Sequence, residues 1–102
     1  MRREGDFEKT IYEEFYYLGD FKNVLEDDET LVLGSSSVIA HDKDGNVVTD
    51  DVVESGTLSV SGSQLLAKVK AGLTSLSPYT VYFKCTTSNN NKYEAWGYMH
   101  II

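Results

Sequence analysis

The end of the sequence alternates apolar with more polar side chains over residues 79–87 and again over residues 92–102, and this alternation most constrains the fold. A period of two residues is that of a β-strand with one buried face. The stretches are separated by Ser-Asn-Asn-Asn at residues 88–91, and asparagine favours turns because it tolerates positive φ and bonds to nearby backbone. The pattern therefore predicts an antiparallel β-hairpin.

The two faces of this hairpin predict its register, because a slip of one residue would mix the apolar and polar side chains. In the predicted register the bulky ring of Phe83 covers Gly97 on the core side. The predicted pairs are Cys85–Ala95, Phe83–Gly97, Val81–Met99 and Tyr79–Ile101 on the core face, and Tyr82–Tyr98 and Lys84–Trp96 on the outer face.

The preceding sequence predicts further short strands, with turn signals about every 8–12 residues. Residues 57–61 and 64–70 alternate clearly, and residues 30–41 are rich in β-branched side chains. The pairs at residues 47–48 and 52–53 continue the β pattern on either side of an acidic pair. Repeated short strands of this kind predict an all-β sandwich of about seven to eight strands.

The segment at residues 11–18 fits two structures. Ile11, Phe15 and Leu18 have helical spacing, but the run is short, rich in tyrosine and closed by Gly19-Asp20, which favours a first edge strand. Residues 1–10 show neither period, and we expect a flexible N-terminal arm that either stays disordered or orders on a partner. Residues 11–102 then form the sandwich, because 102 residues suffice for a single domain.

Charge and cysteine content exclude several classes of protein. Sixteen acidic against nine basic side chains give a net charge of −7, and the cations form no stripe, so we expect no nucleic-acid partner. Cys85 is the only cysteine, so an intrachain disulfide is impossible. Residues 1–10 contain no apolar core and no apolar run is long enough to span a membrane, so we expect no signal peptide and no membrane partner.

The sequence shows no catalytic constellation, and we expect no enzyme, no cofactor and no catalytic residue. His41 and His100 fall on different predicted strands, and Cys85 falls on a core-facing position. Asp42, Asp44 and Asn46 have the oxygen spacing that begins a calcium loop, but the later ligands of that motif are absent. A turn rich in Asp and Asn accounts for these residues, and we expect no metal site.

Four residues on the outer face of the hairpin form the candidate interaction surface: Tyr82, Lys84, Trp96 and Tyr98. Tryptophan and tyrosine are the usual anchors of protein interfaces. Two alternative roles for these side chains stay open. One is ordinary cross-strand packing with a Lys84–Trp96 cation–π contact, and in the second the aromatic residues of segment 12–17 cover this face within the chain.

The order of these signals resembles a known family. Phe15-Tyr16-Tyr17-Leu18-Gly19-Asp20-Phe21, Leu25, Asp28-Glu29-Thr30-Leu31 and Ser35-Ser36-Ser37-Val38 are similar to the first half of small phage fibre–tail adaptor-like proteins. Residues 44–49, Gly62, residues 79–81, residues 86–89 and Tyr93-Glu94 are similar to their remainder. The chain departs from the family at Asp28, where glycine is usual, at the Asn triplet 89–91, and at Trp96-Gly97.

The resemblance covers roughly residues 15–101 and implies an immunoglobulin-like, non-enzymatic virion protein, located at the head–tail junction, the tail or the fibre attachment. The partners it implies are other virion proteins, in a homo-oligomeric ring or lattice assembled in the host cytoplasm. The alternatives are a capsid decoration protein and a module that recognises a host surface or a carbohydrate.

Overall fold

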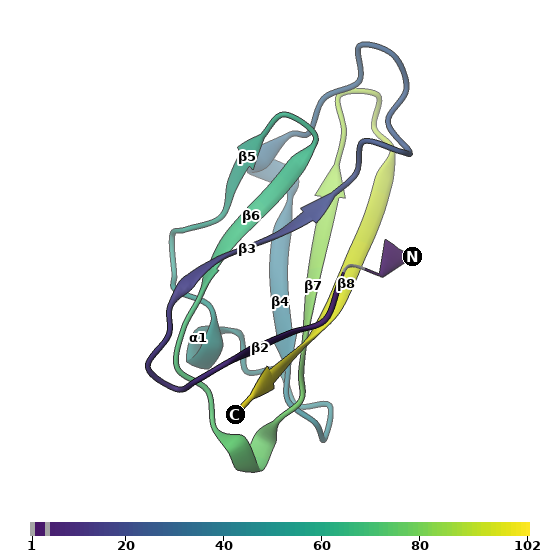
Figure 1. Ribbon diagram of the computed structural model, residues 1–102. Helices are drawn as coiled ribbons and strands as arrows, with labels where there is room; N and C mark the ends of the chain where they lie inside the picture. Colours follow the sequence, from purple (N-terminus) through teal and green to yellow (C-terminus); the bar gives the residue numbers. More distant parts are fainter. Residues whose placement is uncertain (1, 4) are drawn as a thin grey trace.

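The computed structural model describes residues 2–3 and 5–102, which fold into two facing β-sheets (Figure 1). The β8 sheet contains β1, β2, β4, β7 and β8, and the β6 sheet contains β3, β5 and β6. Short helical segments lie in the connections. The bounds are Arg2–Arg3 (β1), Phe7–Lys9 (β2), Phe15–Asp20 (β3), Leu33–Ser35 (3-10 helix η1), Ser37–His41 (β4), Thr49–Val52 (α1), Ser59–Ser61 (β5), Gln64–Val69 (β6), Thr74–Leu76 (3-10 helix η2), Tyr79–Thr86 (β7) and Lys92–Ile101 (β8).

Strands β7 and β8 form the predicted hairpin, but their register differs from the prediction by two residues. Phe83 lies opposite Ala95, not opposite Gly97, so each side chain keeps its predicted face and changes its partner. The turn sets this register: the N–H of Thr87 donates to the carbonyl of Asn91, and Asn90 takes a φ of 62°. Residues 88–90 thus form a short loop that ends in a left-handed residue, a common hairpin connection.

The β6 sheet packs against the β8 sheet through the alternate residues of its strands. β3 and β5 both run antiparallel to β6, and Leu65, Ala67 and Val69 of β6 are fully buried. Gly19 of β3 marks a close approach between the sheets. A Cβ at this position would lie 3.1 Å from the Cβ of Ala95 and 3.1 Å from Cδ2 of Phe83.

The strand order identifies the fold. β4, β7 and β8 occupy the places of strands C, F and G of an immunoglobulin domain, and β3, β6 and β5 occupy those of B, E and D. Tyr79, at the start of β7, is 1% exposed, and its hydroxyl accepts a hydrogen bond from the N–H of Leu73 at 2.9 Å. This is the tyrosine corner of such domains. The chain is an all-β immunoglobulin-like sandwich, and the predicted fold class is confirmed.

The first two strands depart from the antiparallel pattern, because β1 and β2 both run parallel to β8. β2 lies within the region that we predicted to be a flexible arm, and there the structure differs from the prediction. Phe7 packs its ring against Phe15 and Tyr17 of the opposite sheet, with ring centroids 5.5 and 4.4 Å away. Met1 and Glu4 of the predicted arm lie outside the described residues.

Lys9 explains why residues 7–9 are held in place. Its side chain is fully buried, and its ammonium donates hydrogen bonds to the carbonyls of Thr10 and Ala71. Burial lowers the pKa of Lys9, and the carboxylates of Glu13 and Glu14 partly oppose this shift. A lysine in a polar stretch gives no sign in the sequence that it will become a buried link, so the arm prediction missed it.

Two other segments differ from their predicted form. The predicted strand at 11–18 begins only at Phe15, and Tyr12 before it is 93% exposed. Val52 ends helix α1, although we assigned residues 52–53 to the β pattern. This segment turns because Thr49 accepts a hydrogen bond from the N–H of Ala40, while Val48 donates one to the carbonyl of Ala40. Residues 48–49 thereby close part of the edge of β4.

Candidate protein-contact surface

The outward side chains of β4, β7 and β8 form a broad face on the side of the β8 sheet that is turned away from the β6 sheet. In β7 and β8 every second residue is buried in the core, so the residues between them point outward. We call this surface the aromatic face. It comprises Ile39, His41, Thr80, Tyr82, Lys84, Glu94, Trp96, Tyr98 and His100, and its cross-strand rows are Ile39–Tyr82–Trp96 and His41–Thr80–Tyr98.

Rings contact one another along this face. The imidazole of His41 lies edge-on to Tyr82, with centroids 5.2 Å apart, and Trp96 lies edge-on to Tyr98 at 5.3 Å. The imidazole of His100 follows at 6.3 Å from Tyr98. Edge-to-face pairs at these distances are favourable and hold the rings in fixed orientations. All these side chains remain partly exposed, so the face presents ordered aromatic edges to solvent.

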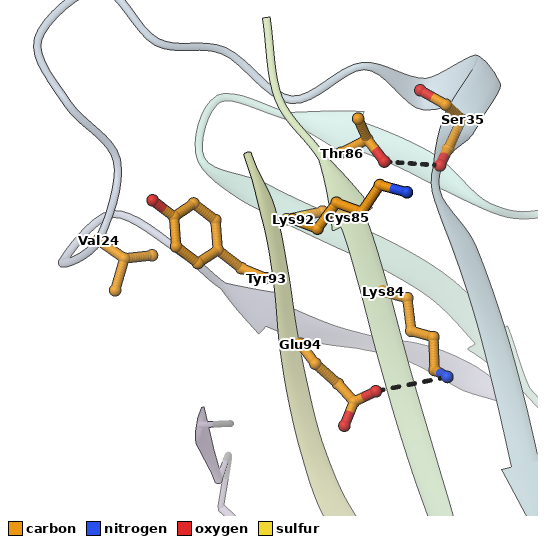
Figure 2. A pocket seen from close by; sticks show the side chains of 8 residues that line it. All are labelled: Val24, Ser35, Lys84, Cys85, Thr86, Lys92, Tyr93 and Glu94. Atoms are coloured by element: carbon orange, nitrogen blue, oxygen red, sulfur yellow. Dashed lines mark hydrogen bonds and ion pairs between the residues drawn. The ribbon is translucent and has the colours of Figure 1, made fainter. Parts of the chain in front are cut away.

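An ion pair marks one end of the aromatic face. Lys84 lies opposite Glu94, and its ammonium is 3.5 Å from the Glu94 carboxylate (Figure 2). The predicted contact of Lys84 with Trp96 is therefore replaced by this pair, because the register shift puts Tyr82 opposite Trp96. The two charges cancel locally, which leaves the aromatic face nearly neutral on a strongly acidic protein.

The N-terminal strands border this face along β8. Glu8 of β2 lies beside His100, and both side chains are on the outer surface. Between β1 and β2, the carboxylate of Asp6 accepts a hydrogen bond from the N–H of Tyr98 at 3.1 Å. The Asp6 carboxylate thus bonds to a backbone donor of β8 between the two short strands.

A groove of about 550 Å³ lies at the hairpin end of the sandwich, next to the Lys84–Glu94 pair. Figure 2 shows the ring of Tyr93 directed toward Val24, while the hydroxyl of Thr86 bonds to the carbonyl of Ser35 at 3.1 Å. Cys85 also lines the groove, but it is 3% exposed, and burial raises the pKa of its thiol. A buried thiol with a raised pKa is a poor nucleophile.

The structure brings all four predicted surface residues to one face. Tyr82 and Lys84 come from β7, and Trp96 and Tyr98 from β8. Sequence reasoning missed the contribution of β4, whose residues Ile39 and His41 extend the face by one strand. The sequence gives no clear signal for this contribution, because the apolar run at residues 38–40 does not alternate with polar residues.

The predicted alternative of a cover by segment 12–17 is wrong. Phe15 and Tyr17 point into the core and pack against it, and Tyr16 is 53% exposed on the outer side of the β6 sheet. Tyr12 is in the loop that precedes β3. The described part of this segment therefore lies on the opposite side of the molecule from the aromatic face.

Two buried carboxylates accept hydrogen bonds from residues of the loops around them. Hydrogen bonds from the Thr87 hydroxyl and the Glu26 N–H lower the pKa of Glu29, and its carboxylate also accepts one from Asn91. Glu29 thereby joins the acidic loop to the hairpin turn. Burial would raise the pKa of the second carboxylate, Asp42, but hydrogen bonds from Asn46 and neighbouring backbone outweigh this effect and lower it.

Asp42 also bears on the calcium-like spacing seen in the sequence. Its Oδ1 accepts hydrogen bonds from the N–H groups of Asp44 and Asn46 at 2.9 and 3.0 Å, and its Oδ2 accepts one from the side-chain amide of Asn46 at 3.2 Å. This is an Asx turn, as expected from the residue types. Within residues 2–3 and 5–102, no cluster of three or more His, Cys, Asp or Glu side chains has the arrangement of a metal site.

No family model matches this sequence, and no curated protein matches it. Among the described residues, no helix has the length and apolar character needed to cross a membrane.

Proposed function

We propose that this chain is a non-enzymatic structural protein of a phage particle, acting at a head–tail junction, a tail or a fibre attachment through protein–protein contacts. The observation that carries the proposal is the gathering of three large aromatic residues and two histidines on one sheet face, with edge-to-face contacts between His41 and Tyr82 and between Trp96 and Tyr98. The similarity of the sequence to phage adaptor-like proteins supports the class of particle.

The aromatic face has the composition of an interface centre. Tyr82, Trp96 and Tyr98 supply large amphipathic rings, and the contacts with His41 and with one another order these rings before any partner binds. Ordered side chains lose less entropy on association than mobile ones, so a pre-formed face binds more tightly for the same buried area. Charged residues are depleted at interface centres, and on this face the one lysine is neutralised by Glu94.

The charge of the molecule favours a selective partner. A net charge of −7 opposes non-specific adhesion to other acidic surfaces, while the neutral aromatic face permits close approach. The proposed partners are other virion proteins, with copies of this chain in a homo-oligomeric ring or lattice in the particle. The proposal places the protein in the virion after assembly in the host cytoplasm.

The test replaces the centre of the face in phage that carry the gene. The double variant Trp96→Ser/Tyr98→Ser should fold, because both side chains are on the outer face, yet it should be lost from purified particles. Anchor residues of this type contribute at least about 2 kcal/mol each, or roughly 30-fold in affinity. Tyr12→Ser, which changes an exposed ring in a loop, is the matched control and should be incorporated normally.

Immunoblots of gradient-purified particles measure incorporation, and circular dichroism confirms that each variant is folded. Normal incorporation of the double variant would show that the aromatic face is not the contact. Absence of the unaltered chain from particles would overturn the virion proposal. Binding to a glycan array that the double variant abolishes would instead assign the face to carbohydrate recognition.

A further inference from the structure

The β6 sheet ends at β3, and this edge is open. The strand order is β3-β6-β5, so β6 pairs with one side of β3 and no strand of residues 2–3 and 5–102 pairs with the other (Figure 1). In an immunoglobulin domain the first strand of the chain can occupy this place, beside strand B. Here the N-terminal strands instead lie along β8 in the opposite sheet.

The hydrogen bonds between β3 and β6 determine which backbone N–H and C=O groups of β3 face the open edge. The N–H of Phe21 donates to the carbonyl of Ser63, and the register continues as Gly19–Leu65. In an antiparallel pair alternate residues turn their N–H and C=O toward the partner strand. Residues 15, 17 and 19 therefore bond to β6, while Tyr16 and Leu18 direct their N–H and C=O groups outward.

The other edges of the two sheets are shorter or covered. β5 has three residues. The edge of β4 is closed at Ala40 by hydrogen bonds to Thr49 and Val48, and the edge of β8 is covered by β1 and β2. β3 is thus the longest edge of the described chain that could accept another strand. Exposed edges of this kind pair readily with strands of other chains.

We propose that a second copy of this chain pairs with β3 through its own β3, antiparallel, across a twofold axis at Leu18. This pairing would join the β6 sheets of two molecules into one continuous sheet. At the axis, Leu18 of each copy would exchange both backbone hydrogen bonds with Leu18 of the other.

Charge complementarity selects a second copy as the occupant. In the register centred on Leu18, Tyr16 would lie opposite Asp20 of the other copy. Glu14, whose carboxylate is also 3.9 Å from the Lys68 ammonium of its own chain, would lie beside Lys22 of the other copy just past the strand end. The twofold axis repeats each pairing, so two opposite-charge pairs and two tyrosine–carboxylate pairs flank the central leucines. Opposite charges directly across strands stabilise pairing, and like charges oppose it. The edge is therefore complementary to itself, although the molecule as a whole is acidic.

Sedimentation velocity of the purified chain over concentrations up to about 1 mM, the weak end of specific association, tests the pairing. The unaltered chain should dimerise. Leu18→Pro removes an N–H that points away from β6, so it should leave the fold intact and weaken the dimer by more than about tenfold, since two hydrogen bonds are lost. Leu18→Thr keeps the N–H and should weaken it far less. Thermal melts of dilute protein check that both variants fold.

Charge reversal tests the register. Lys22→Glu should weaken the dimer about fivefold or more, because two carboxylates would then face each other at each of the two symmetry-related contacts between positions 14 and 22. The double variant Glu14→Lys/Lys22→Glu should restore the dimer. A chain that stays monomeric at the highest concentration, or a Leu18→Pro variant that is folded and still dimeric, would overturn the proposal. Failure of the double reversal to restore pairing would overturn the Leu18-centred register.

The inference is independent of the proposed function. Trp96→Ser/Tyr98→Ser alters the opposite sheet and should leave the β3 dimer unchanged. If that variant abolished dimerisation while Leu18→Pro did not, copies would meet through the aromatic face, and the β3 proposal would be excluded.

Discussion

The substitution Gly72→Ala tests how tightly the corner between β6 and β7 is packed. Gly72 has a φ of +96°, and a Cβ there would lie 2.8 Å from Cδ1 of Ile101 and 3.4 Å from Cε1 of Tyr79. Backbone strain at such a φ costs about 1–3 kcal/mol. The added methyl in a packed site costs about 1–3 kcal/mol more. Alanine also restricts the unfolded chain, which returns about 0.4–1 kcal/mol. We therefore expect a net loss of about 1–5.5 kcal/mol.

Gly56→Ala is the matched control for this prediction. Gly56 also has a positive φ, of +80°, but a Cβ there would have no atom within 4 Å. It therefore carries the backbone strain without the clash. Urea denaturation followed by circular dichroism gives the free energy of unfolding of each variant, and we expect Gly72→Ala to lose at least about 1 kcal/mol more than Gly56→Ala.

A second change tests the origin of the difference. Ile101→Val removes the Cδ1 atom that the new methyl would meet, and alone it should cost about 0.5–1.5 kcal/mol. In the Gly72→Ala background it should cost less, or should stabilise, because it relieves the clash. Equal losses for Gly72→Ala and Gly56→Ala, or strict additivity with Ile101→Val, would refute the packing argument.

Two further predictions concern single polar contacts. Tyr79→Phe removes the hydroxyl that accepts the Leu73 N–H, and we expect a loss of about 0.5–1.5 kcal/mol in thermal or urea unfolding; an unchanged stability would show that the tyrosine corner is not stabilising. Because the pKa values of Glu29 and Asp42 are lowered in the folded state, their contribution to stability is full above their ordinary pKa values and is lost as the pH falls through the lowered ones. The destabilisation caused by Asp42→Asn should thus be constant from neutral pH down to about 5 and should shrink in more acid solution, as urea midpoints at a series of pH values will show; a pH-independent difference would contradict this linkage.

The sequence predicts best those parts of the fold in which a strand buries one face. In β6 and β7 every second residue is apolar, and the structure buries Leu65, Ala67, Val81 and Phe83 on the expected side. The hairpin faces were predictable for the same reason. Its register was not, because it depends on how Asn90 completes the turn, and several loops fit the same asparagine-rich sequence.

The N-terminal strands show what periodicity leaves out. β1 and β2 are too short to display a period, and they add to β8 in parallel, so the contacts that hold them are distant in sequence. Lys9 is buried because its ammonium reaches the carbonyl of Ala71, which is 62 positions away. The candidate surface was predictable from the outward residues of β7 and β8. The residues that β4 adds to this surface were not, because they depend on β4 being the neighbour of β7 in the sheet.

The parallel pairing of β2 with β8 has a mechanical consequence. Phe7 lies beside Met99, and Lys9 beside Ile101, while the N–H of Ile102 donates to the carbonyl of Lys9. Tension that pulls the chain before β2 away from the chain after β8 acts along both strands in opposite directions. It therefore shears this ladder, and its hydrogen bonds resist together instead of opening one after another, with the buried Lys9 side chain as an additional anchor. A domain connected in this way resists extension along the axis through its two ends better than an antiparallel hairpin pulled apart from its open end.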